Sequence, residues 1–258
     1  MGATAIIELL AAVAALVAAV FIFDQHLLRP RPYKLMWSLG LLFYSLGAGA
    51  AFAGSASHWT VGEYKAWYFF GGTVTAVFLG LGSLYLLGPR RVAHAVTAIV
   101  AVLSLYVAFR FLTDSVSNAL ATYIAMHGTD TQAVTGKTAL DMLPADVRAI
   151  AIPLNILGGL FLFGGAAWSA WTFWRKRAPG YRLVSMALLA LGAIFPGILT
   201  GVQALGNSGG AALGELLGAL CLLGGLLISL DVFTVFRVPF TNIVVRERHP
   251  VEAKPART

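Results

Sequence analysis

Residues 4–24 of the chain read TAIIELLAAVAALVAAVFIFD, with Glu8 near the start and Asp24 at the end as their only charged side chains. As an α-helix, these 21 residues would extend roughly 31 Å, about the thickness of the hydrocarbon core of a bilayer. No basic residue precedes the stretch, so it lacks the charged start of a cleavable signal peptide. We therefore expect an uncleaved first membrane-spanning helix.

Similar apolar stretches recur along the chain and decide its class. Of the 258 residues, 59% are hydrophobic and only 11% are charged, whereas roughly 25% are charged in soluble domains. The predicted fold class is an all-α membrane protein, with a seven-helix bundle over residues 1–240 and a basic tail over residues 241–258. The seven predicted spans are about 4–24, 34–54, 67–88, 93–113, 148–173, 181–204 and 211–236.

The distribution of positive charge predicts how the chain is threaded. Fourteen of the 18 lysine and arginine residues follow the first, third, fifth and seventh stretches. By the positive-inside rule this side is cytoplasmic, which places the amino terminus outside and the carboxyl terminus inside. The same pattern accounts for the net charge of +7, so we expect no nucleic-acid partner. The expected location is a bacterial-type cytoplasmic membrane, with the lipid bilayer as the surrounding partner.

One long connection, about residues 114–147, lies on the predicted outer side. Within it, residues 115–126 (SVSNALATYIAM) place apolar side chains such as Leu120 and Ile124 at helical spacing. We expect a short amphipathic helix on the outer mouth of the bundle, followed by a polar and irregular stretch. Because proline suits the first turn of a helix, the fifth span should begin near Pro144.

Two passages of the chain resemble each other. Residues 29–48 (RPRPYKLMWSLGLLFYSLGA) and 175–197 (RKRAPGYRLVSMALLALGAIFPG) each combine a basic, proline-containing turn with Tyr-Lys-Leu or Tyr-Arg-Leu and a later Leu-Gly-Ala. True repetition would give a parallel repeat of three helices, one linking helix and three more. The alternative is that basic turns converge on such a pattern without repetition. The topology resembles that of SWEET-type sugar carriers, although the Pro-Gln signature of the wider group is absent.

Seven helices with an outer amino terminus also resemble microbial rhodopsins. Retinal needs a lysine in the seventh helix for its Schiff base, and residues 213–236 contain none. No histidine lies deep in a span, and no Gly-x-Ser-x-Gly elbow occurs. The single cysteine, Cys221, allows no CxxC pair. We therefore expect no cofactor, no metal site, no catalytic residue and no enzyme activity.

Polar side chains inside the apolar stretches form the candidate site. An ionisable group in lipid is costly, so each one is a site hypothesis by default. In the predicted threading they all fall in the outer half of the bundle, where they could converge on an outward-facing pocket. The candidate ligand-binding residues are Glu8, Tyr68, Arg110, Asn155, Gln203 and Glu215.

Arg110 poses the sharpest question of this set. A carboxylate would offset the cost of burying its guanidinium, which favours pairing with Glu215 or Glu8. Alternatively, these three charges are shallow enough to reach the headgroups or to form a structural ion pair. Asn155 could instead satisfy a backbone carbonyl that is freed by the nearby Pro153.

Two functions fit these patterns. The first is a carrier for a small polar or anionic solute, supported by the possible repeat, the glycine-rich spans and the prolines within them. The second is a non-catalytic receptor, sensor or partner subunit, supported by the shallow depth of every charge. The GxxxG spacing of Gly214 and Gly218 suits packing within the bundle or contact with a second copy or a membrane partner protein.

Overall fold

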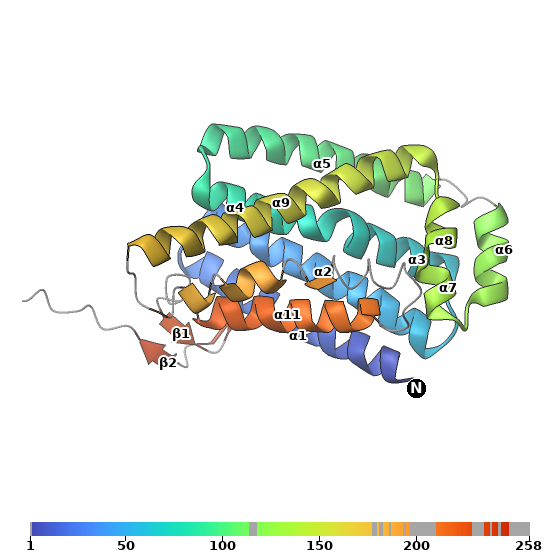
Figure 1. Ribbon diagram of the computed structural model, residues 1–258, viewed down its shortest axis with the longest axis horizontal. Helices are drawn as coiled ribbons and strands as arrows, with labels where there is room; N and C mark the ends of the chain where they lie inside the picture. Colours follow the sequence, from blue (N-terminus) through green and yellow to red (C-terminus); the bar gives the residue numbers. More distant parts are fainter. Residues whose placement is uncertain are drawn as a thin grey trace, which may run out of the picture.

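The computed structural model describes residues 2–113, 118–176 and 210–228 without a break. Within these residues the chain is almost entirely helical (Figure 1). Shorter pieces of the remainder are also described, namely 180, 183–185, 187–192, 195–196, 235–237, 239–241 and 244–247.

Within the described residues, five helices are long and apolar enough to cross a membrane. Their positions agree with the first five predicted spans and are consistent with a multi-pass integral membrane protein. The third is continuous over Val61–Leu87 and comprises three parts, α3 (Val61–Ala66), the π-helical η1 (Trp67–Thr75) and α4 (Ala76–Leu87). The other four are α1 (Ala3–Leu28), α2 (Pro32–Ala56), α5 (Arg90–Thr113) and α9 (Ala145–Arg175).

The last two predicted spans are described only in part. The residues described between 183 and 192 are helical, whereas Gln203 lies outside the described residues. α11 (Gly210–Ile228) is an apolar helix of 19 residues. Residues 235–236 were predicted to end the seventh helix, but they belong to β1 (Val235–Arg237), which pairs antiparallel with β2 (Val244–Glu247). The seven-helix count and the internal repeat therefore stay predictions.

The long helices lie roughly side by side (Figure 1). α1 packs on α2 and α11, α2 also packs on α4, and α4 packs on α9. One end of the bundle carries α6 (Asn118–His127), α7 (Thr131–Thr135) and α8 (Lys137–Asp141), and we call it the cap end. The opposite end carries the turns between α1 and α2 and between α4 and α5, and we call it the basic end. It gathers Arg29, Arg31, Lys34, Arg90, Arg91, Arg175 and Lys176.

α1 shows how the bundle is held together. Its buried side chains are mostly alanines, and Ala11 and Ala15 are each 0% exposed. Its large apolar side chains, including Leu10 and Leu27, face outward instead. A helix of a water-soluble protein would instead bury its large apolar side chains. In lipid there is little hydrophobic drive between helices, and small buried residues let the helix backbones approach closely. The outward leucines would face lipid tails.

The contact between α4 and α9 depends on the same principle. Gly80 and Gly158 face each other, and a Cβ atom added to Gly158 would overlap the backbone of Ala76 and Val77. Glycine at position 158 therefore sets how closely the two helices approach. Gly159, the next residue, has open space around its Cβ position.

The stretch η1 departs from α-helical geometry within the third long helix. The Thr73 hydroxyl donates to the Tyr68 carbonyl at 3.1 Å, and the Thr75 hydroxyl donates to the Phe70 carbonyl at 2.7 Å. Each of these bonds reaches five residues back, which matches the wider π-helical turn. Nothing in the hydrophobic spacing of the sequence predicted this stretch.

The cap end confirms one expectation and corrects another. α6 buries Leu120 and Ile124, which are 0% and 2% exposed, as its amphipathic pattern predicted. The stretch after it was predicted to be irregular, but it forms α7 and α8. The reason is local, because Asp130 accepts hydrogen bonds from two backbone N–H groups and so caps α7. α9 begins directly after Pro144, as expected.

Trp59 ties the cap to the bundle. Its backbone N–H donates to the Gly128 carbonyl at 2.8 Å, and its indole N–H donates to the Thr131 hydroxyl at 3.1 Å. The side chain is 1% exposed and belongs to an apolar cluster with Leu120, Ile124 and the start of α9. The cap is therefore packed against the spans.

Replacement of Gly158 by alanine should destabilise the bundle, because the new Cβ overlaps the α4 backbone. We expect a loss of about 1–3 kcal/mol, typical of overpacking. The matched control is Gly159→Ala, which should leave stability unchanged or slightly raised. Thermal unfolding in detergent measures both variants, and equal melting temperatures would contradict the assigned helix contact.

Candidate functional site

The candidate residues predicted from the sequence do not gather in one place. Of the six, five are described: Glu8 and Glu215 lie near each other, whereas Tyr68, Arg110 and Asn155 lie elsewhere in the bundle. Asn155 is exposed on α9, where Ile152 and Ile156 on either side are 54% and 58% exposed. Its side chain therefore faces away from the bundle interior.

Arg110 is held at the cap end by a carboxylate from the neighbouring span. Its Nε donates to Oδ2 of Asp146 at 2.7 Å, and Nη2 lies 3.4 Å from Oδ1. The Tyr106 hydroxyl donates to the same Oδ2 at 2.8 Å. The side chains of Arg110 and Asp146 are 28% and 37% exposed, so the pair lies near the surface of the bundle.

The predicted pairing of Arg110 with Glu215 or Glu8 is therefore wrong. The alternative of a structural ion pair fits, because the guanidinium and both acceptor oxygens are used within the pair. The sequence did contain a signal for Asp146. Asp146 lies at the start of the fifth span, on the same side of the membrane as Arg110 near the end of the fourth. Tyr106 lies one helical turn before Arg110.

Glu8 is buried in the interface between α1 and its neighbours. It is 3% exposed, and its Oε2 has no hydrogen-bond partner among the described residues. The buried residues around it on α1 are alanines, which offer no polar group. An unpartnered carboxyl oxygen inside an apolar interface is costly, so this position calls for a functional explanation.

A second carboxyl group lies near Glu8. Glu215 on α11 is close enough for the charges of the two carboxyls to act on each other. The position of α11 is fixed there, since the Tyr44 hydroxyl of α2 donates to the Glu215 backbone carbonyl at 2.6 Å. Three helices therefore bring Glu8 and Glu215 together, and we call these two residues the carboxyl pair.

Hydroxyl groups connect the carboxyl pair to the cap. The Ser55 hydroxyl, near the end of α2, interacts with the Glu8 carboxyl. Ser55 Oγ in turn lies 2.9 Å from the Thr131 Oγ1 of α7, within hydrogen-bond distance. Hydroxyl groups both donate and accept, so this row can pass a proton between its members. Sequence reasoning missed Ser55 and Thr131, because their closeness depends on how the cap folds back.

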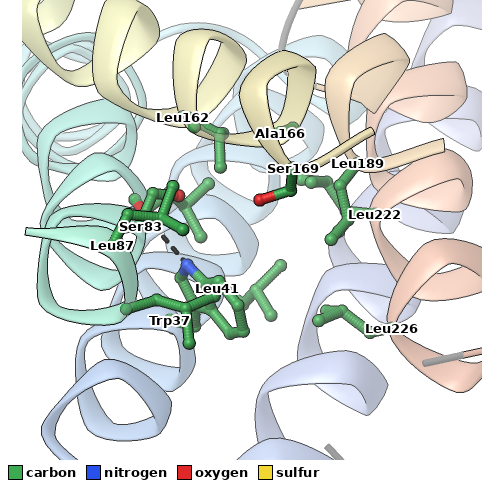
Figure 2. A pocket seen from close by; sticks show the side chains of 13 residues that line it. Trp37, Leu41, Ser83, Leu87, Leu162, Ala166, Ser169, Leu189, Leu222 and Leu226 are labelled. Atoms are coloured by element: carbon green, nitrogen blue, oxygen red, sulfur yellow. Dashed lines mark hydrogen bonds between the residues drawn. The ribbon is translucent and has the colours of Figure 1, made fainter. Parts of the chain in front are cut away.

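One pocket among the described residues lies toward the basic end of the bundle and is apolar. It is lined by residues of α2, α4, α9 and α11 and by Leu189. Leucine side chains such as Leu41, Leu162 and Leu222 line it (Figure 2). At its edge, the Trp37 indole N–H donates a hydrogen bond to the Leu79 carbonyl at 3.1 Å. This slot is not the outward polar pocket that the sequence predicted.

Metal ligation has no support in the described part of the chain. Within it, no three histidine, cysteine, aspartate or glutamate side chains come together in a way that could hold a metal ion. The carboxyl pair contributes only two such groups. Two neighbouring carboxyl groups can exchange a proton or bind a monovalent cation.

The ion pair of Arg110 and Asp146 can be tested by a double-mutant cycle. Arg110→Leu should lower the melting temperature in detergent, because Asp146 loses its partner. The double variant Arg110→Leu/Asp146→Leu should lose less than the sum of the two single variants. Tyr106→Phe, which removes only one bond to the same carboxylate, should have the smallest effect. Strict additivity of the two leucine variants would show that the pair does not couple.

Comparison with known proteins assigns no family to this chain. No family model matches it, and neither a curated protein nor a solved structure is significantly similar to it. Its function must therefore be inferred from the carboxyl pair and the groups around it.

Proposed function

We propose that this protein is a proton-binding carrier of a cytoplasmic membrane, in which the carboxyl pair of Glu8 and Glu215 takes up and releases a proton during transport. The observation that supports it most is the unpartnered Oε2 of Glu8, buried at 3% exposure beside a second carboxyl. The proposal keeps the carrier function predicted from the sequence but moves its centre to two of the six candidate residues.

The electrostatics of the pair support a proton as its ligand. Two carboxylates that share a water-poor site repel each other, and the repulsion is stronger there than in water. A proton shared between them removes one charge and gives Glu8 Oε2 a hydrogen-bond partner. This is the arrangement of carboxyl dyads in which two groups hold one proton between them.

The route for the proton would run through the cap. Ser55 and Thr131 form a row of hydroxyls that leads from Glu8 toward α7, and Thr131 is partly exposed. If the basic end faces the cytoplasm, as the positive-inside rule predicts, protons enter from the outer side. Seven spans in total would complete the bundle around this route.

A second candidate function is a non-catalytic partner subunit of a membrane complex. The observation that favours it is the apolar slot, which is lined mainly by leucines and has only Ser83 and Ser169 as hydroxyl groups, so it gives little support to a polar route toward the basic end. A carrier must open such a route in another conformation, whereas a partner subunit needs none. A measurement of charge movement separates the two.

Dicyclohexylcarbodiimide tests whether Glu8 holds a proton, because it modifies protonated carboxyl groups in apolar surroundings. We expect the reagent to label Glu8 at neutral pH, as seen by peptide mass spectrometry. Glu8→Gln should abolish the labelling. Glu215→Gln should reduce labelling of Glu8, since the repulsion that favours its protonated form is then lost.

Glu63→Gln is the matched control for this labelling. Glu63 accepts a hydrogen bond from the Thr60 backbone N–H at 2.7 Å at the start of α3, and glutamine can keep that bond. Labelling of Glu8 should be the same in this variant as in the unchanged protein. Absence of label at Glu8 in folded protein would overturn the proposal of a protonated pair.

A rapid pH change on proteoliposomes tests the transport part of the proposal. Lowering the pH should produce a transient current on a solid-supported membrane, because a proton moves into the bundle. The double variant Glu8→Gln/Glu215→Gln should abolish the current, and Glu63→Gln should preserve it. Labelling of Glu8 without any current would favour the partner subunit over the carrier.

A further inference from the structure

A second polar site lies beneath the cap, where Tyr64 and Tyr68 meet the start of α9. The two tyrosines are one helical turn apart and therefore project from the same face of their helix. They are 0% and 7% exposed and pack in one apolar cluster with Leu143 and Val147. We call the group formed by Tyr64, Tyr68 and Arg148 the tyrosine niche.

The tyrosine niche contains buried donors that the described residues leave unused. The Tyr64 hydroxyl and the Arg148 Nε are both buried and have no hydrogen-bond partner there. Arg148 uses Nη1 to donate to Asp141 Oδ1 at 2.9 Å, which leaves its Nε edge turned elsewhere. Electrostatic interactions link Arg148 to Tyr68 and Tyr68 to Tyr64, so the three groups share one neighbourhood.

These groups are mainly hydrogen-bond donors. A guanidinium edge can only donate, and phenol hydroxyls donate readily when an acceptor is near. Lys65, adjacent to Tyr64, adds a second positive charge, and its Nζ donates to the Phe111 carbonyl at 2.8 Å. Asp141 offsets one of the two charges. Among the described residues, the site therefore has more donors than acceptors and carries a slight excess of positive charge.

We propose that the tyrosine niche binds the carboxylate group of a small solute, with Arg148 Nε and the Tyr64 hydroxyl donating to its oxygens. A carboxylate matches a guanidinium edge in both charge and geometry. Aromatic rings around the niche suit the apolar part of such a solute. The ring centroid of Trp67 lies 5.7 Å from that of Tyr64, and the centroid of Phe111 lies 6.0 Å from that of Tyr68. This inference does not rest on the carboxyl pair, which belongs to α1 and α11.

Trp67 provides a reporter for this site. Its ring centroid lies 5.7 Å from that of Tyr64 and 6.4 Å from that of Tyr68, so a ligand between the tyrosines should alter its fluorescence. The probe is sodium acetate, added to the purified full-length protein in detergent. Sodium chloride at equal ionic strength is the reference. We expect a saturable change with acetate alone, and Trp67→Phe should remove that change.

Thermal shift with the same two salts gives a second readout. Acetate should raise the melting temperature of the unchanged protein and of Tyr123→Phe, the matched control, whose hydroxyl donates to Ala133 within the cap. Without acetate, Tyr64→Phe should be as stable as the unchanged protein or more stable, because a buried unused donor is removed. It should also lose most of the acetate-induced shift.

Arg148→Lys keeps the charge but not the guanidinium edge, and it should weaken the response to acetate. The proposal is overturned if acetate acts no differently from chloride. It is equally overturned if Tyr64→Phe responds as the unchanged protein does, since the unused donors would then serve water only. Neither result depends on whether Glu8 carries a proton, so the two proposals can fail separately.

Discussion

A carboxyl group inside a membrane bundle must find a partner, and the burial of Glu8 is the constraint on which the functional account depends. Alanines along α1 let α2 and α11 approach closely, and that approach removes Glu8 from water. The same contact brings Glu215 near and places the Ser55 hydroxyl beside the acid. Close packing by small residues, which holds the bundle together, thus also creates the site.

Charged side chains have different partners at the two ends of the bundle and in its interior. Arg110 and Asp146 neutralise each other near the surface at the cap end, where water still screens them. At the basic end, Lys34 is buried and donates to the Gln25 carbonyl at 3.0 Å, while Asp24 accepts from the Phe240 backbone N–H at 3.1 Å. These groups have ready partners and so fit structural roles. The carboxyl pair stands apart from them because Glu8 Oε2 has no hydrogen-bond partner among the residues that the structure describes.

The sequence predicted the first five spans well and the contacts of the site residues poorly, for physical reasons. Length and hydropathy suffice to locate a helix in lipid, and the amphipathic pattern around Leu120 and Ile124 suffices to predict a docked helix. Which polar groups meet depends instead on how helices turn about their axes. Arg110 was assigned to the wrong carboxylate for this reason, and Asn155 was placed inside although it faces outward. The π-helical stretch and the Ser55–Thr131 contact leave no periodic signal at all.

Infrared difference spectroscopy tests the central claim most directly, because a protonated carboxyl has a carbonyl stretch that a carboxylate lacks. The claim predicts a protonated-carboxyl band at neutral pH that disappears in Glu8→Gln and weakens in Glu215→Gln, with Glu63→Gln unchanged. The band should also shift when the protein is transferred to heavy water. A spectrum at neutral pH without any such band, or with one that persists in Glu8→Gln/Glu215→Gln, would contradict it.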